Sequence, residues 1–311
     1  MEVIVAHLDN PDQLDESLRS ATLVLNAAGP YSLTALPIVN ACIRNKTHYL
    51  DVSGELPVIE RLAGMNTAAI NAGIMLMPAV GYAVVPSDCM ALKASRLVHE
   101  PTHLRIALSH FELFATGSAK SMLELVRNSV KVRRNGQMTN VAVGSLEKSF
   151  DFGSGMSVAT AINWSDSFTA YYATGIPNIE VYLEANIYER WMYALSSASS
   201  VWIRQPVTQA WLATQAEWVL SARSKPSLEK ELAGRRRCLI VEVCNAAGHT
   251  VQLRLSSPDP YTVTRQSAVE IMHRVMARNF KPGFQTPAAM YGDSLLKVLS
   301  GLQIDQCEYQ Q

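Results

Sequence analysis

Two strand-like segments near the start of this 311-residue chain run into residues that could contact a ligand. Thr22–Asn26 runs into small residues that leave the backbone open to a ligand. His48–Val52 runs into a segment that carries hydroxyl and carboxylate groups. Ligands of open α/β sheets lie outside the carboxyl ends of the strands, so we expect both segments to line one crevice. The residues expected there are Asn26, Ala27, Ala28, Gly29, Pro30, Asp51, Ser53 and Glu55.

The polar groups of this crevice have two interpretations. A crevice of this kind receives a nucleotide, and Asp51, Ser53 and Glu55 would then hold ribose hydroxyls or an amide group. Alternatively, a carboxylate at a strand end caps the helix that follows. The sequence leaves both interpretations open.

The elements that would position these residues alternate between strand and helix. Short apolar strands are expected at Glu2–Ala6, Thr22–Asn26, His48–Val52 and Gly73–Pro78, with helical stretches between them. Asn10, Pro11 and Gln13 give the N-cap, N1 and N3 residues of a first helix. Residues 1–88 are therefore predicted to form a partial doubly wound, Rossmann-like parallel sheet.

The rest of the chain, residues 89–311, is predicted to be an α+β domain for substrate binding or dimerisation, with residues 280–311 packing back on the first domain. A helix is expected at Cys89–Val98, and Ser87 and Asp88 are expected to begin it. The expected strands, largely antiparallel, are Leu104–Ser109, Val141–Val143, Asn178–Leu183, Cys238–Asn245 and Thr250–Ser256. Trp191–Ala222 is expected to be helical and to pack in the core, with a lid or a dimer face as the alternative.

The composition and a few sequence patterns limit which partners, cellular location and metal sites the chain is expected to have. Lysine plus arginine and aspartate plus glutamate balance at 27 each, so no global field favours nucleic acid. Five cysteines without a Cys-x-x-Cys pair suggest reduced thiols in a cytoplasmic protein. The charge-free runs Ala21–Ile43 and Leu62–Ser87 contain Pro, Gly and Asn and are expected to be buried strands and helices rather than membrane spans. Pro101 breaks the zinc-protease pattern His99-Glu-Pro-Thr-His103, which predicts a helix-to-strand turn and no metal site.

Four stretches of the sequence resemble motifs of one enzyme family. Gly81-Tyr-Ala-Val-Val-Pro-Ser-Asp88, Gly117-Ser-Ala-Lys-Ser121, the stretch from Thr169 to Tyr182, and Gly283-Phe-Gln-Thr-Pro-Ala288 are similar to successive stretches of the saccharopine dehydrogenase-like oxidoreductases, which include the trans-acting enoyl reductases. The resemblance implies an NADP(H)-dependent oxidoreductase that transfers hydride to an activated C=C or C=N bond. It also implies a small-molecule substrate, with an acyl compound as one option, and leaves a homodimer open.

The resemblance also suggests which residues would carry catalysis. Negative charge grows on the substrate oxygen during enoyl reduction, and a tyrosine hydroxyl that stays protonated at neutral pH can stabilise it. Tyr171 and Tyr172 are the candidates, with Tyr82 as a third, while an ordinary core tyrosine is the alternative for each. Gly117, Ser118 and Ser121 form either a turn against substrate or a helix start.

Two departures from the family motivate a different hypothesis. The sequence contains no Gly-x-Gly-x-x-Gly, the turn that places a cofactor pyrophosphate at a helix N-terminus. Met1–Asp9 resembles the family's third strand, so the resemblance implies that the parallel sheet lacks its first strands. Ala83 and Val84 stand where the family usually has Asp and Ser. The alternative function is therefore a catalytically inactive remnant or fragment that serves as a binding or assembly module. A weaker third hypothesis is an acyl-chain carrier that uses the tryptophan-rich region.

Overall fold

A computed structural model describes residues 3–109, 129–153, 155–185 and 237–310. Contacts between Cα atoms divide the chain into two compact units. Unit 1 comprises Met1–Arg96, Trp164–Gly175 and Pro260–Leu302, and unit 2 comprises Leu97–Asn163, Ile176–Asp259 and Gln303–Gln311. Each unit is therefore assembled from segments that lie far apart in the sequence.

Unit 1 is built on a parallel sheet, sheet A, with strand order β1-β2-β3-β12. Its strands are β1 (Leu23–Asn26), β2 (His48–Asp51), β3 (Met75–Met77) and β12 (Gly283–Phe284). All three pairings are parallel. The predicted partial doubly wound sheet is thus confirmed, and its fourth strand comes from the far end of the chain.

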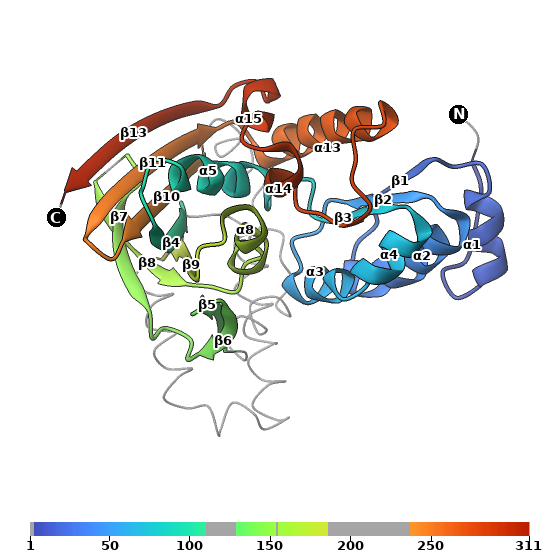
Figure 1. The fold of residues 1–311 in the computed structure, drawn as a ribbon, viewed down its shortest axis with the longest axis horizontal. Helices are drawn as coiled ribbons and strands as arrows, with labels where there is room; N and C mark the ends of the chain where they lie inside the picture. Colours follow the sequence, from blue (N-terminus) through green and yellow to red (C-terminus); the bar gives the residue numbers. More distant parts are fainter. Residues whose placement is uncertain (1–2, 110–128, 154, 186–236, 311) are drawn as a thin grey trace, which may run out of the picture. The chain divides into compact units, whose positions relative to one another are not determined.

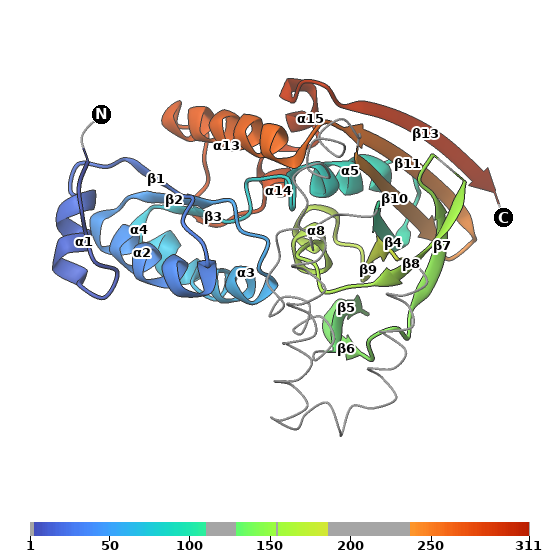
Figure 2. The ribbon, with the colours of Figure 1, turned by 180° about the vertical axis from the view of Figure 1, so that it is seen from behind.

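Helices lie on both faces of sheet A. Figures 1 and 2 show α13 on one face and α2, α3 and α4 on the other. The helices of unit 1 are α1 (Pro11–Leu18), α2 (Tyr31–Asn45), α3 (Leu56–Ala63), α4 (Asn66–Ala72), α5 (Val85–Ser95), α8 (Asp166–Thr174), α13 (Pro260–Met276), α14 (Pro287–Tyr291) and α15 (Leu295–Val298). The apolar side chains of sheet A, α2 and α3 form a common core that includes Val39, Tyr49, Ile59 and Leu76.

The first helix begins as expected. The Asn10 side chain accepts a hydrogen bond from the Gln13 N–H at 3.2 Å, and Pro11 occupies the first helical turn. The segment before it was predicted wrongly, because Val3–His7 forms no strand and Val3 and Val5 are more than three-quarters exposed. The helix expected at Cys89 begins earlier, at Val85, and ends at Ser95.

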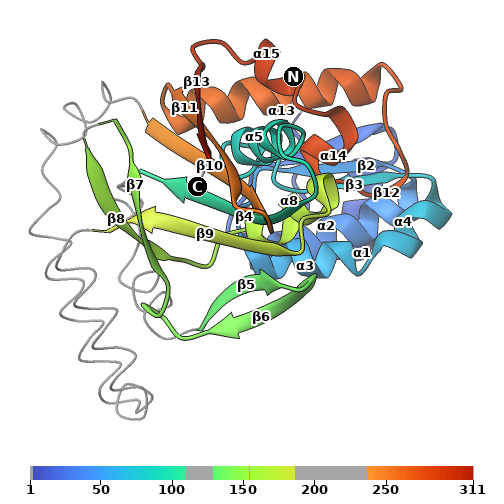
Figure 3. The ribbon, with the colours of Figure 1, turned by 60° about the vertical axis from the view of Figure 1, so that its left-hand side comes forward.

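Unit 2 is built on a mostly antiparallel sheet, sheet B, in which β4 and β9 are the parallel pair. Figure 3 shows β5 to β8 curling away from the central strands. Its strands are β4 (Pro101–Leu108), β5 (Val130–Arg134), β6 (Gln137–Val141), β7 (Glu147–Asp151), β8 (Met156–Ala161), β9 (Asn178–Glu184), β10 (Arg237–Asn245), β11 (His249–Ser257) and β13 (Gln303–Gln310). The α+β prediction is confirmed, although the strand expected at Val141–Val143 is displaced, since β6 ends at Val141.

Two further sequence predictions can be compared with the described residues. Pro101 begins β4 after α5 has ended at Ser95, which confirms the helix-to-strand turn. No helix within the described ranges combines the length and the apolar character needed to cross a membrane. The predictions for Gly117–Ser121 and Trp191–Ala222 fall outside the described residues.

Candidate functional site

The carboxyl ends of the four parallel strands of sheet A define the candidate site. The chain leaves β1 through Ala27–Pro30, leaves β2 through Val52–Glu55, and leaves β3 through Pro78–Val84. Ligands of open parallel sheets bind at this edge. All of the crevice residues expected from the sequence therefore lie at one edge of one unit.

The loop after β1 is held by a buried asparagine. The Asn26 Oδ1 atom accepts a hydrogen bond from the Ala28 N–H at 3.0 Å, and its Nδ2 atom donates to the Thr34 hydroxyl at 3.2 Å. The Thr34 hydroxyl in turn donates to the Ala28 carbonyl at 2.6 Å. Ala27, Ala28, Gly29 and Pro30 are all exposed. The loop thus presents a fixed backbone with small side chains to solvent.

Tyr49 connects this loop to Asp51. The Tyr49 hydroxyl accepts from Asn26 Nδ2 at 3.1 Å and donates to Asp51 Oδ2 at 2.9 Å. The other Asp51 oxygen accepts from the backbone N–H groups of Ser53 at 3.0 Å and Ala79 at 2.8 Å. Burial raises the pKa of Asp51, although these hydrogen bonds oppose the shift. Asp51 therefore ties β2 to the loop after β3, with both of its oxygens engaged.

Glu55 closes the N-terminus of α2. Its two carboxylate oxygens accept hydrogen bonds from the N–H groups of Tyr31 at 2.9 Å and Ser32 at 3.0 Å. A negative charge is favourable there because a helix carries partial positive charge at its N-terminus. Burial, together with the charges of Asp51 and Glu55, raises the pKa of Tyr31 to about 12. The helix-capping interpretation of Glu55 thus has direct geometric support, while a role toward ligand stays a prediction.

The start of helix α8 lies at the same edge. The Ser165 hydroxyl donates to the Gly54 carbonyl at 2.8 Å, and the Trp164 indole donates to the Ala83 carbonyl at 2.9 Å. These bonds fix the start of α8 against the loops that follow β2 and β3. Sequence analysis missed both residues, because neither belongs to a recognisable motif.

The three candidate tyrosines differ in their surroundings. Tyr171 and Tyr172 on α8 are 36% and 46% exposed. The Tyr172 ring packs against Phe168 and Phe284, with centroid distances of 5.4 and 5.2 Å. Tyr82 is half-buried, and its backbone N–H donates to Thr264 of α13 at 3.0 Å. All three therefore lie in unit 1, and their role as donors to substrate stays a prediction.

Two buried carboxyl groups near this edge were not expected as a pair. Asp88 was expected to begin a helix at Cys89, but it lies inside α5, and its Oδ2 atom accepts from the Ala288 N–H of α14 at 3.1 Å. Burial raises the pKa of Asp88 to about 6. Burial, together with the charge of Asp88, raises the pKa of Asp166 at the start of α8. No sequence signal links the two, because Asp166 lies 78 positions after Asp88.

A shallow pocket of about 110 Å³ lies between α2 and α3. Its walls are mostly apolar, and Arg61 is the one charged residue among those that line it. The lining residues are Tyr31, Ser32, Ala35, Leu36, Pro57, Val58, Arg61 and Leu62. A small apolar group of a ligand could fit there, beside the start of α2.

Comparisons with known proteins agree with the parallel sheet of unit 1. Residues 2–77 match the family model described as the saccharopine dehydrogenase NADP binding domain. A saccharopine dehydrogenase-like oxidoreductase of Rattus norvegicus is 36% identical over 87 residues, which are 28% of this chain and 20% of that protein. A trans-acting enoyl reductase of Mycobacterium leprae is 37% identical over 101 residues, 32% of this chain and 24% of that protein. The matched part thus spans about a fifth to a quarter of these relatives.

A solved structure extends the likeness to the whole fold. The apo saccharopine dehydrogenase (L-Glu forming) of Saccharomyces cerevisiae matches with a TM-score of 0.60 and 14% identity. The match covers 98% of this chain and 88% of that one. At this identity the match establishes the fold alone. The resemblance inferred from the sequence motifs is confirmed, as is the Rossmann-type fold, and residues 2–77 match an NADP-binding domain.

Proposed function

We propose that the protein is an NADP-dependent oxidoreductase that reduces an activated C=C or C=N bond, on the similarity of residues 2–77 to the saccharopine dehydrogenase NADP binding domain and to the saccharopine dehydrogenase-like oxidoreductases. The observation that carries the proposal is the loop Ala27–Pro30. It is exposed, made of small residues, and fixed at the carboxyl edge of a parallel sheet. A cytoplasmic location is proposed with it, from the composition.

The residues at this edge fit one end of the cofactor. A flat ring and a ribose can approach the small loop closely, and no side chain larger than proline projects from Ala27–Pro30. The start of α2 does not offer the usual phosphate site, because Glu55 already occupies the N–H groups of Tyr31 and Ser32. We therefore assign the nicotinamide and ribose end of NADP(H) to this loop and leave the pyrophosphate unassigned.

The chain's own residues have defined tasks in this proposal. Bound NADPH supplies the hydride. Tyr171, Tyr172 or Tyr82 donates a hydrogen bond, and then a proton, to the atom on which negative charge develops. Asn26 and Tyr49 keep the loop in one conformation, so the ring is positioned without reorganisation. The apolar pocket beside Arg61 supports the option of an acyl substrate, because it accommodates a short alkyl group.

The test is a titration of the chain with NADPH, followed by nucleotide fluorescence and by thermal unfolding. Ala27→Glu adds bulk and negative charge in the loop, and Ala277→Glu makes the same change at an exposed turn after α13. We expect NADPH to raise the Tm of the wild type and of Ala277→Glu, because a ligand that binds only the native state stabilises it. Ala27→Glu should lose most of that rise.

The alternative is a binding or assembly module without catalysis. A well-folded wild type whose Tm NADPH does not change, and which reduces no enoyl thioester or imine, would support that alternative. An equal response from Ala27→Glu and the wild type would mean that cofactor binds elsewhere, and would refute the assignment of the loop.

A further inference from the structure

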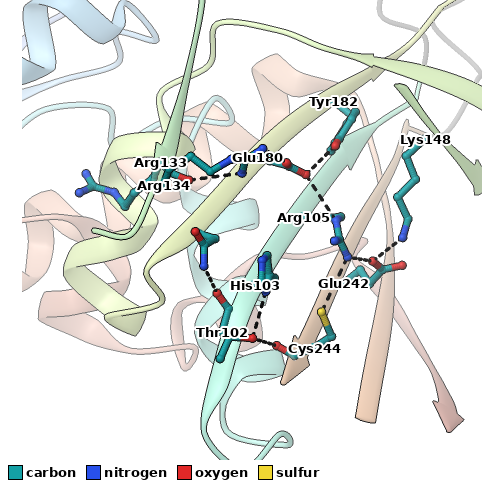
Figure 4. Close-up of polar contacts among 11 residues, drawn as sticks. Thr102, His103, Arg105, Arg133, Arg134, Lys148, Glu180, Tyr182, Glu242 and Cys244 are labelled. Atoms are coloured by element: carbon teal, nitrogen blue, oxygen red, sulfur yellow. Dashed lines mark hydrogen bonds and ion pairs between the residues drawn. The ribbon is translucent and has the colours of Figure 1, made fainter. Parts of the chain in front are cut away.

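A row of charged side chains crosses the central strands of sheet B. Glu180 of β9, Arg105 of β4 and Glu242 of β10 lie directly opposite one another in the strand register. Figure 4 shows the three side chains on the same face of the sheet. The Arg105 Nη1 atom lies 2.7 Å from Glu242 Oε1, and its Nε atom lies 3.4 Å from Glu180 Oε2. One arginine thus bridges two carboxylates.

Two further cations reach the ends of this row from neighbouring strands. Lys148 of β7 places its Nζ atom 2.8 Å from Glu242 Oε1, the oxygen that Arg105 also contacts. Arg134 of β5 donates to Glu180 through Nη2. We call Arg105, Arg134, Lys148, Glu180 and Glu242 the charged row, which joins five strands.

The charges of this row do not balance. Three cations face two carboxylates, which leaves one positive charge in excess. Both carboxylates are nearly buried, since their side chains are 10% and 9% exposed. Glu180 already forms an ion pair with Arg105 and accepts hydrogen bonds from Arg134 and from the Tyr182 hydroxyl. The carboxylates of the row therefore cannot neutralise the excess, and charge held in a partly buried place is costly without a counter-charge.

The cations retain unused donors on the side open to solvent. The side chains of Arg105, Arg134 and Lys148 are 25%, 32% and 35% exposed. An arginine has five N–H donors and a lysine has three, whereas each of these cations makes only one to three contacts within the described residues. An anion with several oxygen atoms can accept from neighbouring cations simultaneously.

Titratable groups also surround the row: the Tyr182 hydroxyl donates to Glu180, and the Cys244 Sγ atom lies 3.8 Å from Arg105 Nη1. His103 lies two residues before Arg105 on β4, and burial, together with the charge of Arg105, lowers the pKa of its imidazole. A neutral imidazole beside the row adds no charge to that of the three cations. A balanced pair on the same face provides a comparison, because Arg254 of β11 lies 3.2 Å from Asp305 of β13, one charge against one.

We propose that the charged row is a binding site for a small anion with several oxygen atoms, a carboxylate or a phosphate group. Arg105, Arg134 and Lys148 supply the charge and the donors, and the two glutamates hold the cations in place. The site is independent of the NADP proposal, because every residue that forms it belongs to unit 2.

The test compares salts at constant ionic strength, using the whole chain in a non-coordinating buffer. Inorganic phosphate and glutarate are each compared with chloride by thermal unfolding, and their dissociation constants are measured by calorimetry. For an anion at about ten times its Kd we expect a rise in Tm of roughly 2–4 °C. Lys148→Met keeps the alkyl chain and removes a charge, and should weaken binding by about tenfold or more. Arg254→Gln is the matched control and should bind like the wild type.

Each result decides the proposal. Binding of glutarate alone would assign the site to carboxylates, binding of phosphate alone would assign it to phosphates, and binding of both would support the shared chemistry. Equal unfolding temperatures in all three salts would overturn the proposal. So would wild-type affinity in Lys148→Met, or an equal loss in Arg254→Gln.

Discussion

Replacing Tyr49 by Phe tests whether the hydrogen-bonded chain Asn26–Tyr49–Asp51 holds the candidate site together. The Tyr49 side chain is fully buried, and its ring belongs to the core of unit 1. Phe keeps that ring packing and removes only the hydroxyl. Asp51 Oδ2 then loses its donor while remaining buried, and Asn26 keeps its bond to Thr34.

The expected loss of stability follows from the burial of the acceptor. A buried acceptor that loses its donor costs about 1–3 kcal/mol, so we expect Tyr49→Phe to lower the free energy of unfolding by about 2–3 kcal/mol. The native pKa of Asp51 is raised, so its protonated form favours folding, and stability falls as pH rises through that pKa. Removing the Tyr49 donor raises this pKa further, and the loss should therefore be larger at pH 7.5 than at pH 4.5.

Urea unfolding at the two pH values measures both effects. Tyr291→Phe is the matched control, because the Tyr291 hydroxyl donates to a neutral acceptor, the Asn279 carbonyl, at 2.8 Å. It should lose about 1 kcal/mol with no dependence on pH in this range. The reasoning fails if Tyr49→Phe costs no more than Tyr291→Phe, or if its cost is the same at both pH values.

Two further substitutions test other carboxylates of unit 1. Glu55→Ala should lower the free energy of unfolding by about 1–2 kcal/mol through loss of the α2 cap, measured by urea unfolding, and Glu55→Gln should recover part of it; equal stability of Glu55→Ala and wild type would contradict the capping role. Asp88→Asn removes a group whose native pKa is about 6 against an ordinary 3.8, so the variant should exceed wild type by up to about 3 kcal/mol above pH 7 and lose that advantage near pH 4. Thermal unfolding from pH 4 to 8 measures this. Asp15→Asn removes a carboxylate whose pKa Arg44 lowers, so its stability relative to wild type should fall as pH rises. If both variants changed with pH in the same direction, the raised pKa of Asp88 would be refuted.

Much of sheet A could be predicted from the sequence because each strand is a short apolar run followed by small or polar residues. The same signal was misleading at Val3–Val5, which is apolar and β-branched yet forms no strand. Strand formation depends on a neighbour that accepts and donates the backbone hydrogen bonds, and the described residues pair no strand with that segment. Local pattern therefore predicts the ability to form a strand, and the partner decides whether it forms.

In the candidate site, the sequence predicts the positions of residues along the strands but not their hydrogen-bond partners. The sequence located Asp51 and Glu55 at the correct edge, since position along a strand is a local property. Their partners are not local: Asp51 accepts from Ala79, 28 positions away, and Glu55 accepts from Tyr31, 24 positions away. The bond between Asp88 and Ala288 spans 200 positions. These contacts depend on how the chain packs, and neither motif nor spacing indicates them.

The pairing of β12 with β3 affects how sheet A folds during synthesis of the chain. The strand that completes sheet A, Gly283–Phe284, is made roughly 200 residues after β3. At typical rates of synthesis this interval lasts about 10–40 s. Throughout it, the edge of β3 that β12 will cover has emerged from the ribosome without its partner, so a nascent chain is exposed to misassociation until Gly283–Phe284 has been translated.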